Sequence, residues 1–448
     1  MQVLIASGVL VVAMLAGSAA SAQPQDDSFK ACIDTLRAER RQHPQVRAET
    51  FDRYTLGATD LRPTIASATG SQPEFTIPVW DYVARLVDSE RVADGQQALL
   101  QHAGPLTAIT RRHGVDPATI VAFFGIETDY GRVEGRHGVV DATLSRACLD
   151  LKSKERQRHF FAALWLLQQG LVQPETFRGS WAGAFGLTQF MPGTFVAYMD
   201  DGDASGSVDI VGSVADALAT TAHYVGSLGW TPGLRWGVEV RLPGGALARG
   251  LIAAEREHGC LSSQEVAGKC RTVEEWAALG IATNGQAGER LPADAGLPKG
   301  TRAALLAPSG PDGPAWLVTR NYRAIWQYNR ADAYALAIGL LSDALRGDPP
   351  LRRAWPTVDP GLSRAEMREL QQDLFDRGHT DVTPDGADGP RTRAAIRVEE
   401  LRLGWPETGR AGQQIARALR DERAAAPNAP SGVAPPPADA PPVTDEPR

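Results

Sequence analysis

The sequence lacks three features that would each point to a broad class of protein. Lys and Arg number 46 against 53 Asp and Glu, a net charge of −7, so the chain lacks the positive field that binding to nucleic-acid phosphates requires. After the N-terminus, no apolar run reaches the roughly 18 residues of a membrane-spanning helix. The 4 cysteines form no CxxC pair or Cys/His spacing. We therefore predict neither a nucleic-acid partner nor a membrane anchor nor a zinc site.

The N-terminus instead has most of the pattern of a secretory signal peptide. The apolar run Val3–Ala16 is too short to span a bilayer, and Ala20–Ala22 offers the small residues of a cleavage site. The first basic residue is Lys30, which departs from the usual pattern. We expect residues 1–22 to be removed on export, and the mature protein to be a soluble periplasmic monomer.

Export would place the cysteines Cys32, Cys148, Cys260 and Cys270 in an oxidising compartment, where disulfides form. Cys260 and Cys270 are close in sequence, and pairing them would leave Cys32 with Cys148, joining the N-terminal helix to the main domain. Four cysteines allow three pairings, and the sequence does not choose among them. Four buried free thiols are the alternative.

A length of 448 residues allows roughly two to four domains. Residues 347–360 contain four prolines and interrupt every periodic pattern, so they are interpreted as a linker. The predicted order is a signal peptide (1–22), a main domain (23–346) with a loop and short-strand insertion over about 230–315, the linker (347–360), a small helical domain (361–421) and a disordered Pro/Ala-rich tail (422–448).

One acidic residue has a pattern that suits acid–base chemistry. Asp116-Pro117 supplies an N-cap and a proline in the first turn, and predicts a helix on which Ile120, Phe124 and Glu127 share one stripe. A carboxyl group beside aromatic residues is desolvated, which raises its pKa and keeps it protonated near neutrality. Glu127 is therefore a candidate general acid. A surface or capping glutamate is the alternative.

Long motifs give this helix a context. Five long motifs follow one another along the chain. They are QPEFTIPVWDYV (72–83), GIETDYGR (125–132), GSWAGAFGLTQFMP (179–192), SLGW (227–230) and WLVTRNYRAIWQYNRADAYALAI (316–338). In these motifs the sequence resembles the membrane-bound type B lytic transglycosylases of the goose-lysozyme-like superfamily, over roughly residues 31–343. The resemblance implies a mainly α protein, with a lysozyme-like α+β catalytic domain followed by a small three-helix domain.

The resemblance also implies an activity. Such enzymes cleave the β-1,4 bond between N-acetylmuramic acid and N-acetylglucosamine in peptidoglycan without water, leaving a 1,6-anhydromuramoyl end. One glutamate acts first as acid and then as base, and its matching position is Glu127. Asp129 and Glu134 are interpreted as solvated or capping residues. The alternatives are a water-using muramidase of the same fold and a non-catalytic scaffold that binds the cell wall.

Six further positions match residues that contact sugar in this family. Aromatic rings stack on the apolar faces of sugars, and amides bond hydroxyl and acetamido groups. For Tyr224 and Tyr334, a place in the core is an equal alternative. The predicted substrate-binding residues are Ser180, Gln189, Tyr224, Tyr328, Asn329 and Tyr334.

The loop 201–209 resembles the first part of an EF-hand. Oxygen-bearing residues stand at positions 1, 3, 5, 7 and 9 and a glycine at position 6, but position 12 is Gly212. Some members of the resembled family close such a calcium loop with a later aspartate. The candidate ligands are then Asp201, Asp203, Ser205, Ser207, Asp209 and Asp216. A plain Asx-rich turn is the alternative. No cofactor is required by the expected chemistry.

The small C-terminal domain resembles a three-helix peptidoglycan-binding domain. The matching residues include Leu370-Gln371, Asp385-Gly386 and Gly389-Pro390, whereas Val398-Glu399 replaces a usual Phe-Gln. The sequence therefore supports the fold better than affinity for the wall. The expected partner is the glycan strand of peptidoglycan, and a helical interaction domain without glycan binding is the alternative.

Overall fold

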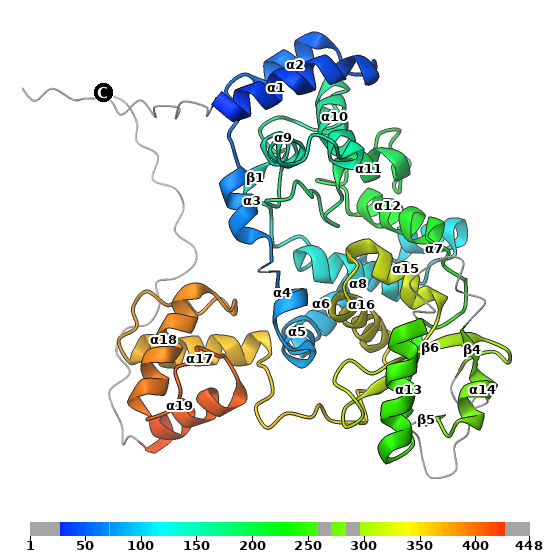
Figure 1. Cartoon of the computed structure of the whole chain (residues 1–448), viewed down its shortest axis with the longest axis vertical. Coiled ribbons are helices and arrows are strands. Elements are labelled where there is room, and N and C mark those ends of the chain that lie inside the picture. Colours follow the sequence, from blue (N-terminus) through cyan, green and yellow to red (C-terminus); the bar gives the residue numbers. More distant parts are fainter. Residues whose placement is uncertain (1–26, 71, 259–269, 284–295, 426–448) are drawn as a thin grey trace, which may run out of the picture. The chain divides into compact units, whose positions relative to one another are not determined.

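The structure is a computed structural model that describes residues 27–70, 72–258, 270–283 and 296–425 (Figure 1). The expected signal peptide, Cys260 and most of the expected tail lie outside these residues. The chain divides into two units. Among the described residues, unit 1 comprises those of 27–67, 135–185 and 190–197, and unit 2 those of 68–134, 186–189 and 198–425.

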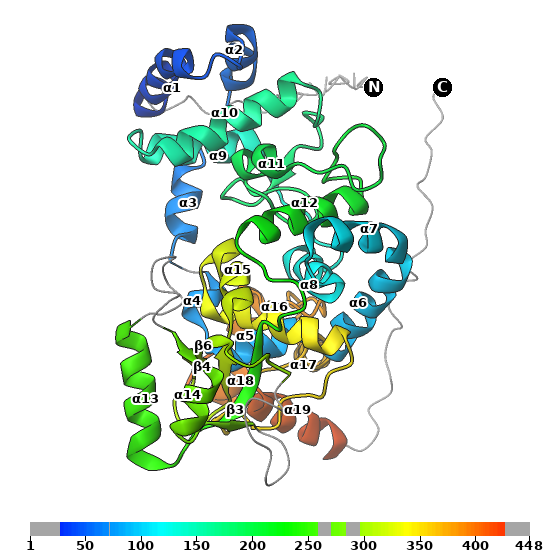
Figure 2. The ribbon, with the colours of Figure 1, turned by 90° about the vertical axis from the view of Figure 1, so that its right-hand side faces the viewer.

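Unit 1 is helical around a core of aromatic residues. Helices α9 and α10 pack side by side (Figure 2), and Phe29, Phe51, Phe160 and Phe161 are fully buried between the helices. Its elements are α1 (Asp27–Glu39), the 3-10 turn η1 (Arg40–Gln42), α2 (Ala48–Thr55), α3 (Arg62–Ala68), β1 (His137–Gly138), α9 (Val139–Leu149), α10 (Lys154–Gln168), β2 (Arg178–Gly179) and α11 (Pro192–Tyr198). Strands β1 and β2 pair antiparallel.

A disulfide joins Cys32 of α1 to Cys148 of α9, with 5.6 Å between the two Cα atoms. This is one of the three pairings that the sequence allows. It links the first described helix to the core of unit 1, as expected for that pairing. The second predicted pair includes Cys260, which lies outside the described residues, and stays a prediction.

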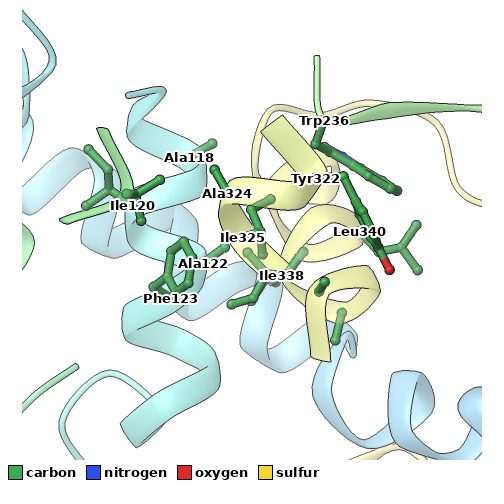
Figure 3. Close-up of a cluster of buried hydrophobic side chains, with 14 of the residues drawn as sticks. Ala118, Ile120, Ala122, Phe123, Trp236, Tyr322, Ala324, Ile325, Ile338 and Leu340 are labelled. Carbon is green, nitrogen blue, oxygen red and sulfur yellow. The ribbon is translucent and has the colours of Figure 1, made fainter. Parts of the chain in front are cut away.

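The main core of unit 2 surrounds helix α8. Figure 3 shows Phe123 of α8, Ile325 of α15 and Ile338 of α16 in this core. The helices that build it are α4 (Pro73–Thr76), α5 (Val79–Leu86), α6 (Ser89–Gln101), α7 (Ala103–His113), α8 (Pro117–Thr128), α12 (Val214–Ser227), α15 (Arg320–Asn329) and α16 (Asp332–Leu345).

The N-terminus predicted for α8 is confirmed. The Asp116 carboxylate accepts a hydrogen bond from the backbone N–H of Thr119, 3.0 Å away, and Pro117 is the first helical residue. The predicted single apolar stripe is too narrow, because residues 118–125 are all buried. Helices α6, α7, α12 and α16 contact α8, so α8 is a central helix and not an amphipathic surface helix.

The insertion over about 230–315 holds a sheet with the strand order β4-β6-β7-β3-β5, in which all neighbours are antiparallel. The strands are β3 (Gly237–Arg241), β4 (Arg271–Thr272), β5 (Ala282–Thr283), β6 (Arg302–Leu306) and β7 (Ala315–Val318). The insertion also holds α13 (Gly245–His258) and α14 (Val273–Ala278), so the prediction of loops and short strands alone is wrong. In α13, Ala248, Leu251 and Ile252 are buried at helical spacing in a core shared with the sheet.

The C-terminal domain has the three predicted helices, α17 (Arg364–Asp376), α18 (Pro390–Arg402) and α19 (Gln413–Ala425). Leu370, Ile396 and Leu419 are fully buried in their common core. Helix α19 continues through residues 422–425, which corrects the predicted start of the tail at 422. Ion pairs to α17 and α18 fix this last turn, since Arg423 pairs with Asp373 at 2.5 Å and Glu422 with Arg402 at 2.6 Å.

No helix in the described ranges has both the length and the apolar character needed to cross a membrane.

We expect the Cys32–Cys148 disulfide to stabilise unit 1 measurably. The crosslink encloses a sequence separation of 116 residues, so it restricts the unfolded chain, and the Cys32→Ala/Cys148→Ala variant should lose about 2–4 kcal/mol of unfolding free energy. Urea unfolding followed by fluorescence measures this loss. An unchanged midpoint would contradict the prediction, and adding reductant to the variant should shift the transition less than adding it to the wild type.

Candidate active site

Glu127 is the penultimate residue of α8 and is half-buried. The helix ends at Thr128, because Asp129 and Tyr130 take left-handed backbone angles, with φ of 50° and 58°. The Tyr130 ring folds back onto α8, where a Cβ on Gly125 would lie only 2.6 Å from it. A side chain at position 125 would therefore displace the Tyr130 ring, which packs on α8 beside Glu127.

Burial gives Glu127 an unusual acidity. Desolvation is the largest effect and raises the pKa of its carboxyl group to about 7. A hydrogen bond from the Tyr334 hydroxyl to Glu127 Oε1 opposes this rise, whereas the negative charge of Glu74 adds to it. At neutral pH the carboxyl is thus present in both protonation states, as a group that gives and later accepts a proton needs to be.

Three of the predicted substrate-binding residues are tyrosines that lie together near Glu127. The Tyr328 and Tyr334 rings are stacked at a centroid separation of 6.4 Å, and Tyr224 lies 5.5 Å from Tyr328. Tyr334 is buried, with 2% of its surface exposed, which fits the core alternative, yet its hydroxyl donates to Glu127. Burial raises the pKa of the Tyr334 hydroxyl well above its usual range, so Tyr334 keeps the proton that it donates.

The segment 186–189 lies against this group of tyrosines. The Tyr328 hydroxyl donates to the Thr188 carbonyl at 2.6 Å, which joins the segment to α15. Gln189 has a left-handed backbone, with φ of 51°, and its side-chain amide donates to the Gly186 carbonyl at 2.9 Å. Gln189 therefore lies next to a residue that Tyr328 contacts. Its own side-chain amide, however, is bonded within the turn 186–189.

Asn329 contacts Glu74, a residue that the sequence motifs do not mark as functional. Its side-chain amide donates to Glu74 Oε1 of α4 at 3.3 Å, and the Glu74 charge also acts on Glu127. Glu74 is half-buried. It belongs to the QPEFTIPVWDYV motif, so the motif held the signal. Only the fold, however, brings this carboxylate near Glu127.

Ser180 belongs to unit 1 and is described there. Its hydroxyl oxygen accepts hydrogen bonds from the backbone N–H groups of Ala182 and Ala184, at 3.2 and 3.1 Å. These bonds hold the glycine-rich turn of the GSWAGAFG segment, so Ser180 has a structural role within unit 1. Its predicted contact with sugar stays a prediction.

The calcium-like loop brings three of its six candidate ligands together. One carboxylate oxygen from each of Asp201, Asp203 and Asp216 lies within 4.8 Å of the others. Asp216 is 1% exposed. The Asp209 carboxylate instead accepts from the backbone of Val211 and Gly212 in the next turn. Ser205 donates to the Ser207 carbonyl at 3.1 Å.

Comparison with known families identifies the group to which these features belong. Residues 28–343 match the transglycosylase SLT domain family, over more than half of the chain. This chain belongs to the transglycosylase SLT family. It is accordingly a lytic transglycosylase, and the predicted enzyme class and lysozyme-like, mainly α fold are confirmed. Residues 363–419 match the peptidoglycan binding domain family, which agrees with the predicted C-terminal domain.

Individual relatives support the same assignment. Membrane-bound lytic murein transglycosylase B of Escherichia coli (strain K12) is 26% identical over 268 residues, which span 59% of this chain and 66% of the relative. Pseudomonas aeruginosa SltB3, solved in complex with NAG-anhNAM-pentapeptide, is 38% identical with a TM-score of 0.63, and the match covers 88% of this chain and all of that one. Escherichia coli SLT35 in complex with calcium matches at 21% identity and a TM-score of 0.53, over 72% of this transglycosylase and 93% of SLT35, and supports the fold alone.

We expect two substitutions to move the activity of this transglycosylase along the pH axis in opposite directions. If Glu127 acts as the acid, activity should fall as the pH rises through about 7. Tyr334→Phe removes the hydrogen bond that favours the ionised carboxylate, so the pKa should rise and activity should persist to higher pH. Glu74→Gln removes a neighbouring negative charge, so the pKa should fall and activity should be lost at lower pH.

The pH dependence of kcat/KM on a soluble glycan substrate measures both shifts, because it reports the pKa of the free enzyme. Glu134→Gln is the matched control, since Glu134 is exposed and its charge has no resolved effect on Glu127. Two shifts in the same direction, or none, would contradict the electrostatic account of Glu127.

Proposed function

We propose that this transglycosylase cleaves the β-1,4 bond between N-acetylmuramic acid and N-acetylglucosamine of peptidoglycan and leaves a 1,6-anhydromuramoyl end. The main support is Glu127, a single carboxyl with a pKa of about 7 in contact with a tyrosine hydroxyl. The SltB3 relative was solved with NAG-anhNAM-pentapeptide and with NAG-NAM-pentapeptide, which makes muropeptides a reasonable substrate class for this chain.

In the proposed reaction, protonated Glu127 gives its proton to the glycosidic oxygen as the bond from that oxygen to C1 of the muramoyl residue breaks. The C6 hydroxyl oxygen of the same residue then bonds to C1, and its proton passes to the Glu127 carboxylate. The acid is thereby regenerated, and no water enters. A pKa near neutrality suits both transfers, because neither protonation state of Glu127 is strongly disfavoured.

The substrate would be held mainly by rings and amides. Tyr224 and Tyr328 are half-buried, so each keeps exposed surface that can pack against a sugar ring. We assign Asn329 and Gln189 to hydrogen bonds with hydroxyl and acetamido groups, in exchange for the hydrogen bonds that they make within the protein. We also propose, for unit 1 by itself, that Ser180 contacts a sugar. Tyr334 is assigned to Glu127 and not to a sugar.

The remaining parts of the chain fit a role in the cell wall. We propose that residues 1–22 direct export to the periplasm, and that the C-terminal domain binds peptidoglycan, in line with its family match at 363–419.

Glu127→Gln should abolish the release of anhydromuropeptides from purified sacculi. Because one residue serves as both acid and base, the rate should fall by at least about 10³-fold. Mass spectrometry of the soluble products measures this loss. Glu134→Gln, the same change at an exposed site seven residues further on, should keep the wild-type rate.

The same digest separates the competing functions. Wild-type products that end in reducing muramic acid, each one water heavier than the anhydro form, would contradict the proposed reaction and favour a muramidase. A wild-type protein that is retained on sacculi without releasing any product would favour a non-catalytic scaffold.

We also propose a calcium site at Asp201, Asp203 and Asp216. Carboxylate oxygens are the ligands that calcium prefers, and each of the three residues offers one within 4.8 Å of the others. Asp216 binds the loop from within, because its two oxygens accept the backbone N–H groups of Gly202 and Asp209, both at 2.8 Å. The ion would have a structural role and take no part in proton transfer.

Millimolar calcium should raise the thermal unfolding midpoint of the wild-type protein. A ligand present at about ten times its dissociation constant stabilises the folded state by roughly 1.4 kcal/mol. Asp203→Asn should remove most of this shift, and its exposed position makes the substitution mild. Differential scanning calorimetry with and without calcium is the measurement, and magnesium at the same concentration is the control. An unchanged midpoint would contradict the proposed site.

A further inference from the structure

The turn that follows Glu127 is contacted by a residue from the C-terminal domain. Arg364, the first residue of α17, places its Nη1 atom 2.7 Å from Asp129 Oδ1 and its Nε atom 2.9 Å from Asp88 Oδ2. The side chains of Arg364 and Asp129 are each 16% exposed, and that of Asp88 is 2% exposed. These ion pairs are largely shielded from water, so they are screened less by salt than surface pairs are.

Asp129 is the residue that turns the chain directly after α8. Aspartate tolerates a left-handed backbone, but that of Tyr130 is costly for a bulky residue and persists where tertiary contacts hold it. Arg91 of α6 supplies one such contact, with its Nη2 atom 3.2 Å from Asp129 Oδ1. Arg91 also accepts a hydrogen bond from the Tyr130 hydroxyl at its carbonyl oxygen, 2.8 Å away.

Arg364 makes the shortest ion pairs to the two carboxylates at this helix end. Asp88 caps α6 by accepting the backbone N–H of Arg91 at 2.9 Å, so two shielded carboxylates, Asp88 and Asp129, lie beside the same helix end. Without Arg364, Asp129 would keep only its longer pairs, to Arg91 at 3.2 Å and Arg132 at 3.5 Å, and Asp88 would lose its ion pair with Arg364. A shielded carboxylate left without its partner is strongly destabilising, and the turn at Asp129 would relax to relieve it.

Other contacts keep the C-terminal domain against α5 and α6. Arg410 pairs with Asp81, whose side chain is 3% exposed, and Arg85 pairs with Asp388 at 2.5 Å. Gly361 packs so closely that a Cβ there would lie 2.8 Å from Asp81 Oδ1. The first residues of the domain are thus fitted to α5, and Arg364 is held where it reaches Asp129.

We propose that Arg364 is a positioning residue for catalysis, which acts through Asp129 on the placement of Glu127. The C-terminal domain then has two roles: it binds the wall, and it completes the support of the catalytic helix. This inference rests on the catalytic role proposed for Glu127. It differs from a purely targeting domain, which would alter affinity for insoluble wall and leave the turnover of a bound soluble substrate unchanged.

The test measures kcat and KM of the full chain on a soluble, uncrosslinked peptidoglycan oligosaccharide. Arg364→Gln should lower kcat about ten-fold, since small displacements of a reacting group are costly, and should leave KM within about two-fold. Arg364→Lys keeps the charge and should recover part of kcat. Arg368→Gln is the matched control, because Arg368 lies on the same helix and pairs with Glu90 without contacting Asp129.

Asp129→Asn should reproduce the loss, because asparagine tolerates the left-handed turn but does not attract Arg364 strongly. The Arg364→Gln/Asp129→Asn double variant should lose no more than either single variant, which is the signature of one shared interaction. Circular dichroism checks folding. If Arg364→Gln does not fold, Asp129→Asn and Arg364→Lys carry the test, and wild-type kcat in Asp129→Asn overturns the inference.

Two further results would overturn it. One is a wild-type kcat for Arg364→Gln with reduced retention on sacculi, which would leave a targeting role only. The other is an equal loss of kcat in Arg368→Gln. That result would mean that any loosening of the C-terminal domain lowers kcat, whether or not the contact with Asp129 is lost. The assay counts every glycosidic bond that is cleaved, whether the product has an anhydro or a reducing end. The measured kcat therefore does not depend on the product assigned under the proposed function. Reducing ends from the wild type would contradict the anhydro product, while the comparison of kcat values would still stand.

Discussion

The left-handed turn after helix α8 is the constraint on which the candidate site depends. The turn lets the Tyr130 ring fold back onto α8 beside Gly125, where its hydroxyl donates to the Arg91 carbonyl. The helix stops one residue after Glu127, and its carboxyl lies at the edge of the core, where α16 can reach it. The turn costs backbone energy, so it exists only because the Tyr130 ring and the Asp129 carboxylate each have a partner.

This placement explains how one carboxyl can have a pKa close to neutrality. Deep burial with no partner would raise the pKa of Glu127 further, and full exposure would return it to its ordinary value. The half-buried edge of the core lies between these limits, and two neighbours adjust the result. Tyr334 lowers the pKa through its hydrogen bond, and Glu74 raises it through its charge. The end of α8 therefore determines both where the Glu127 carboxyl lies and how far its pKa is raised.

Local signals in the sequence predicted part of this arrangement. The start of α8 is predictable because a capping aspartate and a proline act over a few residues, and Tyr328 and Tyr334 because they belong to one long motif. The contacts between them are not. Tyr334 meets Glu127 across 207 residues, and Arg364 meets Asp129 across 235. No periodic pattern indicates such long-range contacts, so the sequence alone predicts a solvated or capping role for Asp129. Asp129 is indeed the C-terminal cap of α8, but its carboxylate forms an ion pair with Arg364 and is not solvated.

The excess of acidic residues acts mainly within the protein and not on a partner. A net charge of −7 gives no general attraction to an anionic wall polymer, which is consistent with the proposed hold on the glycan by rings and amides at short range. The charges act within the protein instead. The aspartates on α5 and α6 receive arginines of the C-terminal domain in shielded pairs, which salt weakens little. A polymer bound by ring stacking and domains joined by shielded pairs would both tolerate changes in ionic strength.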